Sequence, residues 1–357
     1  MNAHADFLSD VVRTRTLTPD GVTPLVVEPV RSRDPEALVS WVNENLDALR
    51  EKLRVHGAIL FRGFDIHDAK AFESLARAVD DQLQNKYFGT SPREALTDYV
   101  FTASELPGFY PIPQHCEMSF IAEPPRHLFF WAKEAPHAGG ETPLCDFRAV
   151  YRDMDPGVRQ RFVDGGIRII RNYEGPEGAD KRDLWKLKRW DEIFKTTDRA
   201  EVERMCAEQE FEPIWKDGGR LALISEQPAV REHPETGEMA WFNHVQVFHL
   251  TSGPGELKRI FTHRPKDLRS GALAAVTGAM VMMKKLKAPA EEQAMHCTYA
   301  DGREIPEADL RHVRDLIWKH LVVYPWRTGD VVAIDNRSVS HGRLPYNGPR
   351  QIAVAWA

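Results

Sequence analysis

The hydrophobic positions along the N-terminal part of the chain predict helices that alternate with a buried strand. Apolar residues recur at helical spacing over residues 35–54 and 68–83. Residues 57–64, GAILFRGF, instead form a compact apolar run bounded by glycine. Such a run is typical of a strand that is covered on both faces. This part of the chain therefore has the pattern of mixed α/β structure.

After about residue 97 the pattern changes to short apolar runs separated by turns that contain glycine. Strands are predicted over residues 126–135, 166–173, 329–336 and 350–357, with another after the Gly-Gly turn of PHAGGETPLCD. Helices are predicted over residues 198–209 and 255–288, and over 146–163 with a break around Asp155-Pro156. Residues 309–326 predict a helix that runs towards a strand. Short strands with helices grouped at one end favour an antiparallel sandwich or barrel over a wound parallel sheet.

Two further segments carry structural expectations. Residues 238–250, EMAWFNHVQVFHL, are aromatic and alternate as a strand does, which places Asn243 and His244 on opposite faces. Residues 271–283, GALAAVTGAMVMM, are too short to cross a membrane and predict a buried helix. Since no repeat, low-complexity tract or linker is visible, we expect a single domain over residues 1–357.

Composition excludes several classes of protein. The chain has 42% hydrophobic and 28% charged residues and a net charge of −6, a globular balance without the basic face that nucleic-acid binding requires. Its most basic stretch, residues 181–190, predicts a solvated helix face, and a docking patch or part of a lid is the alternative. Four cysteines without a CxxC pair, and no apparent signal peptide, predict a cytoplasmic protein with reduced thiols.

Three histidines precede a carboxylate by two positions, namely His4, His115 and His233. His4 lies near a terminus, and His233 stands before a proline in an apparent turn. His115 instead adjoins an aromatic, β-prone run. Residues two apart on an extended segment point to the same side, so His115 and Glu117 can share one ion, with Cys116 pointing away. An imidazole and a carboxylate suit Fe(II), Mn or Zn.

The end of the chain offers a third ligand. His341 follows a predicted strand and a polar turn, and Arg350 begins the last strand. Two histidines and one carboxylate form the facial triad of non-haem iron oxygenases, which leaves coordination positions open. A nearby arginine can hold a dicarboxylate by a bidentate contact. His244 and His249 are alternative third ligands, but neither adjoins an HGR motif with a downstream arginine.

With these motifs the chain resembles the Fe(II)- and 2-oxoglutarate-dependent dioxygenases of the TauD/TfdA superfamily, including its clavaminate synthase-like members. The matching segments, in the family's order, are GAILFRGF, the HxE of PQHCEMSF, APHAGGETPLCD and the terminal HGR…GPRQIAV. The resemblance implies a double-stranded β-helix, or jelly-roll, with helices packed outside. The interval between the two histidines is longer than is usual, which implies a lid or substrate-recognition insertion at about residues 176–300.

Carried over residue by residue, the resemblance implies that His115, Glu117 and His341 ligate iron. Arg350 would then pair with the distal carboxylate of 2-oxoglutarate, and Thr142 would hydrogen-bond this co-substrate. The carboxylate ligand is Glu, where aspartate is more frequent in the family. The last strand also carries one arginine where some members have two, so contacts at the other end of 2-oxoglutarate are left open.

Residues for the substrate are less clearly marked. Asn243, His244 and Arg343 are candidates to contact it, and Arg343 is also a weaker candidate for the role of Arg350. The resemblance implies that O2 and 2-oxoglutarate are consumed, with release of succinate and CO2, to oxidise an unactivated C–H bond. A retained carboxylate ligand favours hydroxylation, desaturation or cyclisation over halogenation.

We expect hydroxylation of a small amino-acid-like substrate, either free or tethered to a carrier protein, without a nucleic-acid or membrane partner. One alternative is a desaturase or cyclising oxygenase of a natural-product pathway. Others are a jelly-roll sensor without enzymatic activity and a zinc hydrolase that uses the same three ligands.

Overall fold

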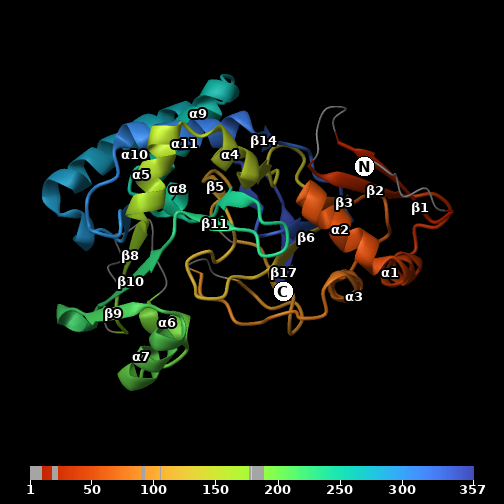
Figure 1. Ribbon diagram of the computed structural model, residues 1–357, viewed down its shortest axis with the longest axis horizontal. Helices are drawn as coiled ribbons and strands as arrows, with labels where there is room; N and C mark the ends of the chain where they lie inside the picture. The colour runs from red at the N-terminus through yellow and green to blue at the C-terminus, as the bar shows by residue number, and fades with distance from the viewer. Residues whose placement is uncertain (1–9, 18–22, 90–92, 105, 177, 179–188) are drawn as a thin grey trace.

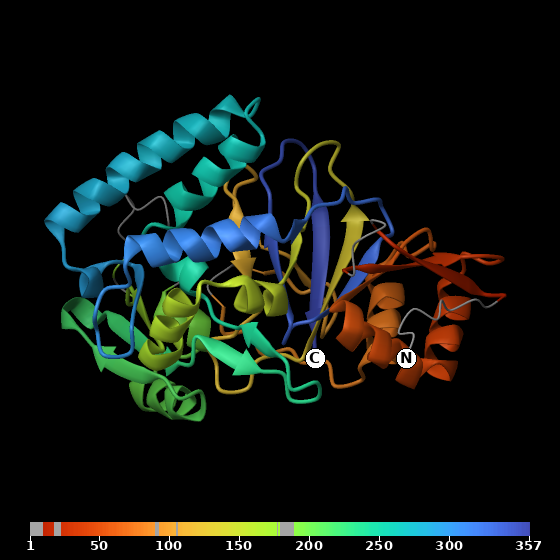
Figure 2. The same cartoon turned by 45° about the horizontal axis from the view of Figure 1, so that its top comes forward.

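The computed structural model describes residues 10–17, 23–89, 93–104, 106–176, 178 and 189–357 (Figure 1). The described chain is a mixed α/β fold with several sheets. Three N-terminal helices lie at one end, the large sheet and the site sheet lie in the middle, and a further sheet with its helices lies at the other end (Figure 2). The basic stretch over residues 181–190 lies outside the described residues except for its last two.

A seven-stranded sheet forms the centre of the molecule. In spatial order its strands are β1 (Val12–Thr16), β2 (Leu25–Pro29), β3 (Ala58–Phe61), β15 (Val331–Asp335), β6 (His127–Glu134), β17 (Gln351–Trp356) and β4 (Phe101–Thr102). All neighbours are antiparallel except β2 and β3. Alternate residues of β3 enter two different apolar cores, so that Leu60 packs in one and Phe61 in the other. Burial on both faces explains the continuous apolar run predicted here.

Helices α1 (Pro35–Glu44), α2 (Leu46–His56) and α3 (Ala69–Val79) cover one face of this sheet. The single helix predicted over residues 35–54 is divided at Asn45, whose backbone N–H bonds the carbonyls of Trp41 and Val42 and closes α1. Helix α2 ends at Gly57, which has a φ of 68°. A left-handed residue at this position is usually glycine because other side chains are strained there.

The other face of the large sheet shares its core with a four-stranded sheet, here called the site sheet. Its strands, in spatial order, are β14 (Leu321–Val322), β7 (Leu144–Asp146), β16 (Val339–Arg343) and β5 (Ile112–His115). The turn over residues 336–338 leads directly from β15 of the large sheet into β16 of the site sheet. These two sheets are therefore joined at the strand that carries the HGR motif.

A third layer is built from residues in the second half of the chain. Its sheet has the order β13-β8-β10-β9, and a separate pair consists of β11 and β12. These strands are β8 (Ile167–Tyr173), β9 (Glu212–Trp215), β10 (Leu221–Gln227), β11 (Val230–Glu232), β12 (Met239–Trp241) and β13 (Met295–Thr298). The remaining helices are α4 (Phe147–Asp153), α5 (Pro156–Gly165), α6 (Trp190–Phe194), α7 (Arg199–Glu208), α8 (Val245–Phe248), α9 (Ser252–His263), α10 (Leu268–Lys287) and α11 (Glu307–Lys319), with short 3₁₀ turns η1 (Asp217–Gly219) and η2 (Ala290–Glu292).

The strand predicted over residues 238–250 is only partly correct. Strand β12 stops at Trp241, and α8 follows. The Asn243 side chain accepts a bond from the backbone N–H of Val245 and donates one to the carbonyl of Ala229. Asparagine in this position competes with an extended backbone and starts a turn. The alternation of faces predicted for Asn243 and His244 therefore does not apply.

The buried helix predicted over residues 271–283 is wrong in its burial. These residues lie in α10, which runs beside α9 at the outer edge of the molecule (Figures 1 and 2). Ser270 is the one buried residue of α10, whereas Val276 and Met282 are 57% and 68% exposed. The helix packs along one side only, where Gly271 faces the Phe261 ring of α9. None of the described helices is long and apolar enough to cross a membrane.

Candidate active site

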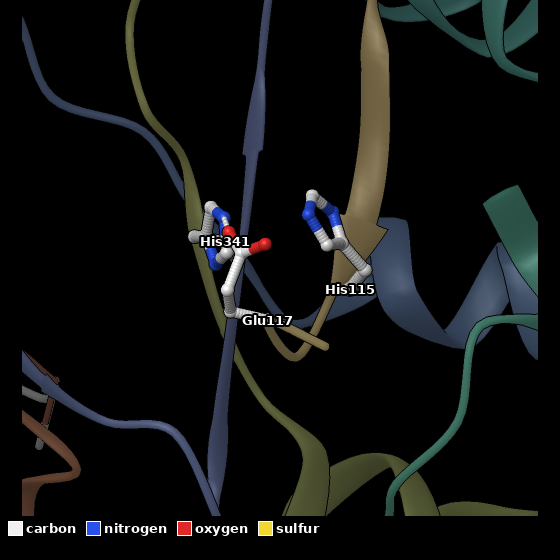
Figure 3. Close-up of side chains that lie close together, drawn as sticks. All are labelled: His115, Glu117 and His341. Carbon is white, nitrogen blue, oxygen red and sulfur yellow. Dashed lines mark ion pairs between the residues drawn. The ribbon is translucent and has the colours of Figure 1, made fainter. Parts of the chain in front are cut away.

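Three side chains converge between the site sheet and the turn that follows β5 (Figure 3). His115 ends β5 and lies directly across from His341 of β16, with 4.3 Å between the ring centroids. The Nε2 atom of His341 lies 3.6 Å from Oε2 of Glu117. One potential ligand atom from each of the three residues lies within 4.8 Å of the others. This group has the donor set of a facial triad.

The backbone of Glu117 differs from the extended conformation that was predicted for it. Strand β5 ends at His115, so Glu117 lies in a turn instead of continuing the strand, and the next residue, Met118, has a φ of 49°. Asn336 holds this turn, because its Oδ1 accepts from the backbone N–H of Glu117 at 2.7 Å and its Nδ2 donates to the carbonyl of Glu117 at 3.0 Å. The turn between β15 and β16 thus fixes the backbone of the carboxylate residue.

The two imidazoles are also positioned by the backbone. Nδ1 of His115 lies 2.9 Å from the carbonyl oxygen of Pro113, which can only accept, so Nδ1 carries the proton and Nε2 is left for a metal. Gly342 permits the close approach of the two strands. A Cβ atom at this position would lie 2.6 Å from the carbonyl oxygen of Ile112.

The charge states of the group suit a divalent cation. Burial, together with the neighbouring His341, lowers the pKa of His115 to about 4. Burial alone would raise the pKa of Glu117, but Arg93 and His341 outweigh this effect and hold that pKa well below its usual range. At neutral pH the site therefore offers a neutral imidazole at His115 and an ionised carboxylate. These are the protonation states that metal ligation requires.

The two predicted co-substrate residues lie side by side. Nη2 of Arg350 donates to Oγ1 of Thr142 at 3.3 Å, and Nε of Arg350 donates to the carbonyl of Gly140 at 2.8 Å. The indole of Trp326 also donates to Oγ1 of Thr142. Burial and the neighbouring Arg343 lower the pKa of Arg350 to about 10, so it stays charged at neutral pH. Thr142 and Arg350 line the same cavity as the three potential metal ligands.

Arg343 also lines this cavity, but its terminal nitrogens are occupied. They donate to the backbone carbonyls of four residues in one loop, Ser104, Leu106, Pro107 and Tyr110. Arg343 thereby fastens this loop to the strand that carries His341. Its proposed contact with a substrate would have to use the remaining Nε, which is buried and has no partner among the described residues.

The other two candidate substrate residues differ in position. Asn243 is fully buried, and its side chain accepts from the backbone N–H of Val245, the first residue of α8. His244 is buried 5.0 Å from the ring of His115, between centroids, and its Nδ1 lies 2.6 Å from Oγ of Ser119. His244 nevertheless does not belong to either group of potential metal ligands found in the described chain.

The remaining histidines of the sequence argument lie away from the triad. His249 belongs to the second group of potential ligands, with His296 and Glu304. His233 is bound to Asp335, 3.0 Å from its carboxylate. His4 lies outside the described residues. Of the histidines considered as the third ligand, the structure places His341, and not His244 or His249, in one group with His115 and Glu117.

Sequence reasoning missed Arg93. Its Nη2 lies 3.2 Å from Oε2 of Glu117, and its guanidinium lies over the rings of Tyr87 and Trp356. Arg93 precedes β4 in a segment without a recognisable motif. The one sequence signal that pointed toward it is indirect, namely the missing second arginine on the last strand.

Comparison with known proteins identifies the family. The sequence model of the family described as "Taurine catabolism dioxygenase TauD, TfdA family" matches residues 14–356. The dapdiamide synthesis protein DdaC of Enterobacter agglomerans is 31% identical over 305 residues, which cover 85% of this chain and 83% of that protein. The clavaminate synthase-like protein At3g21360 of Arabidopsis thaliana is 28% identical over 317 residues, which cover 87% of this chain and 83% of that protein.

Solved structures agree in fold. AAD-2, crystallised with Mn(II) and N-oxalylglycine, has a TM-score of 0.53 at 14% identity, covering 97% of this chain and 96% of its own. PvcB of Pseudomonas aeruginosa has a TM-score of 0.51 at 18% identity, covering 100% of this chain and 94% of its own. The chain therefore belongs to the TauD, TfdA family and is an Fe(II)- and 2-oxoglutarate-dependent oxygenase.

Proposed function

We propose that His115, Glu117 and His341 hold Fe(II) and that Arg350 and Thr142 hold the distal carboxylate of 2-oxoglutarate. The observation that carries this proposal is that all five side chains line one cavity. Three protein ligands leave coordination positions for the co-substrate and O2. The bound iron, with 2-oxoglutarate and O2, supplies the oxidant, and succinate and CO2 are released.

The protein's own contribution is to place these groups before the reactants bind. The carbonyl of Pro113 fixes the tautomer of His115, and Asn336 fixes the backbone of Glu117. Arg350 presents a planar guanidinium whose donors match the two oxygens of a carboxylate. Ligands held in place in advance lose little conformational freedom when the metal and co-substrate enter.

We further propose that the large sheet and the site sheet form the two walls of a double-stranded β-helix. Their shared core and the direct β15–β16 connection support this arrangement. Within a single domain, residues 176–300 would then be an insertion that closes the substrate side. Helix α8 of this segment packs against β5 and brings His244 beside His115, which supports that role.

The substrate that we propose is a small amino-acid-like molecule, which the enzyme hydroxylates at an unactivated C–H bond. DdaC is named for dapdiamide synthesis, and PvcB is described as an oxygenase from an isonitrile synthetic pathway. These names support a small-molecule biosynthetic substrate, either free or tethered to a carrier protein. Retention of Glu117 as a third ligand supports oxygenation over halogenation.

An anaerobic titration of the Fe(II)-loaded protein with 2-oxoglutarate tests the cofactor sites. We expect a weak visible charge-transfer band that saturates at one equivalent. Arg350→Met should raise the Kd for 2-oxoglutarate by about 10- to 100-fold, since a charge-assisted bond contributes about 1.5–3 kcal/mol. The control is Arg264→Met, because Arg264 forms a more exposed ion pair, 3.0 Å from Glu141, beside the same loop.

Each contrary result of this titration has a definite meaning. Folded, iron-loaded protein that gives no band would contradict the proposed sites and leave a sensor as the better account. Turnover supported by zinc without O2 would point to a hydrolase. If Arg350→Met binds 2-oxoglutarate as well as Arg264→Met does, another cation holds the distal carboxylate.

A further inference from the structure

Arg93 is a buried cation in the iron cavity whose hydrogen-bonding capacity is only partly used. Its side chain is 8% exposed. Nη2 reaches Glu117 and the Tyr87 hydroxyl, but Nε and Nη1 are buried and have no hydrogen-bond partner within the described parts of the chain. Buried charged donors are normally paired, because leaving them without partners costs several kcal/mol.

We propose that Arg93 provides a carboxylate-binding subsite at the iron end of the cavity, through a donor that Glu117 and Tyr87 leave free. This inference rests on the proposed function and extends it to the residue that receives a second acidic group. The two free donors lie on different edges of the guanidinium fork, because each edge pairs either Nε or Nη1 with Nη2. Each free donor can therefore give one charge-assisted hydrogen bond to a carboxylate oxygen.

The position of this guanidinium does not depend on Glu117 alone. Its central carbon lies 4.3 Å from the centroid of the Tyr87 ring and 5.6 Å from that of the Trp356 ring. Trp356 is itself fully buried on β17. Stacking on two rings holds the plane of an arginine in place and stabilises its charge.

Arg93 also supplies what the last strand lacks. After Arg350, the β17 side chains that enter the shared core are Ile352, Val354 and Trp356, all apolar. A further cation of the cavity wall, Arg93, comes from the segment between α3 and β4 and packs against the end of β17. Arg350 and Arg93 thus provide two separate places for carboxylates in one cavity.

The balance of charge supports an acidic occupant. Arg93, Arg343 and Arg350 line the cavity, and Glu117 is the one acidic residue among its lining residues in the described chain. Bound Fe(II) adds two positive charges, and 2-oxoglutarate brings two negative ones. The loaded cavity therefore remains positive, which favours a further anion.

Two carboxylates could occupy this subsite, and their chemistry is the same. One is the carboxylate of 2-oxoglutarate nearest the iron, and the other belongs to the substrate. The second case would define the substrate class as a carboxylic acid whose acid group lies near the metal. Titrations of Fe(II)-saturated protein under anaerobic conditions separate these cases.

The test compares Arg93→Met and Arg93→Lys with Arg77→Met. Arg77 makes the same two kinds of contact outside the cavity, since it pairs with Glu73 at 2.8 Å and lies over the Tyr99 ring at 4.5 Å. Each protein is titrated with 2-oxoglutarate. Its 2-oxoglutarate complex is then titrated with acetate and, as the neutral counterpart, with acetamide, following the charge-transfer band.

We expect Arg93→Met to weaken the binding of either 2-oxoglutarate or acetate by about 10- to 100-fold. Arg77→Met should bind both as the wild type does. A raised Kd for 2-oxoglutarate assigns the subsite to the co-substrate. An unchanged Kd, with an acetate-induced band shift that acetamide does not give and that Arg93→Met abolishes, assigns it to the substrate. Arg93→Lys keeps the charge and should retain part of the affinity, which guards against a folding defect in the methionine variant.

The inference is overturned if Arg93→Met behaves as Arg77→Met does in both titrations. A change confined to Fe(II) affinity would also overturn it, because Arg93 would then act only through Glu117. The wild-type protein distinguishes these results from failure of the proposed function. If the wild-type protein shows no charge-transfer band with 2-oxoglutarate, the proposed cofactor site is contradicted, and the subsite that rests on it is contradicted too.

Discussion

The large sheet and the site sheet are both buried, yet they differ in what they bury. Inward residues of the large sheet, such as Leu60 and Phe130, are apolar. The site sheet buries Gln114, Ser340 and His341, and the first two bind each other at 2.8 Å. Polar groups that satisfy one another can be buried without a large penalty, and His341 remains available for a metal. From this difference we expect that stability depends mainly on the large sheet and the proposed chemistry on the site sheet.

The strongest test of this difference between the two sheets is to replace one buried histidine in each sheet. His341→Ala should lower Fe(II) affinity by more than about 100-fold, because loss of a direct ligand exceeds the 10- to 100-fold effects of outer contacts. His127 of β6 is equally buried but binds Asp80, 2.6 Å away. His127→Ala should therefore keep iron and lose stability. Iron content and thermal unfolding of both variants provide the measurement, and iron retained by His341→Ala would refute the assignment.

The next largest effect is expected from the large sheet. Trp131 is 1% exposed, stacks on Phe72 with 5.8 Å between ring centroids, and donates to the carbonyl of Ile66. Trp131→Ala should lower the free energy of unfolding by about 3–5 kcal/mol, measured by urea denaturation. The control is Trp318→Ala, which should lower the free energy of unfolding by less because Trp318 is only half-buried. Iron bound per folded molecule should stay unchanged, and its loss would show that the division between the sheets is too simple.

The smallest effect concerns the residue at the junction of the two sheets. Asp335 ends β15 and binds His233 at 3.0 Å and Ser338 at 2.9 Å. Burial alone would raise the pKa of Asp335, but the bond from His233 and the nearby donors lower it below 3.8. Since the folded-state pKa is the lower one, this stabilisation is present above the unfolded-state pKa and is lost as pH falls through the folded-state pKa.

Asp335→Asn should accordingly destabilise the protein by about 1.5–3 kcal/mol at pH 6. The difference in unfolding free energy between wild type and variant should shrink as the pH is lowered from 6 to 3. Urea denaturation at several pH values measures it. A difference that stays constant over this range would mean that the carboxylate charge does not stabilise the junction.

The fold could be predicted from the sequence where burial leaves a local apolar pattern. Strands β3, β6, β15 and β17 were located by their apolar runs, because burial on both faces leaves a strong local pattern. Helix α10 has an equally apolar sequence but is exposed, since its neighbours are set by tertiary packing that periodicity does not record. An apolar run therefore reports that a residue can be buried and not that it is.

The site was predictable only where a motif marks it. His115, Glu117 and His341 followed from their residue types and order, and the structure places them together. Arg93 and Asn336 also contact Glu117, at 3.2 and 2.7 Å, but each is an ordinary residue whose role depends on contacts between distant parts of the chain. A single sequence without a local pattern gives no sign of such contacts.

The bond between Asn336 and Glu117 also has a consequence for the order of events during synthesis. The two residues are 219 positions apart. At a translation rate of 5–20 residues per second, roughly 10 to 45 s separate their appearance. During that interval the nascent chain carries His115 and Glu117 without the residue that holds their turn and without His341. If His115, Glu117 and His341 hold iron as proposed, the complete site cannot form until residues 336–341 have been synthesised.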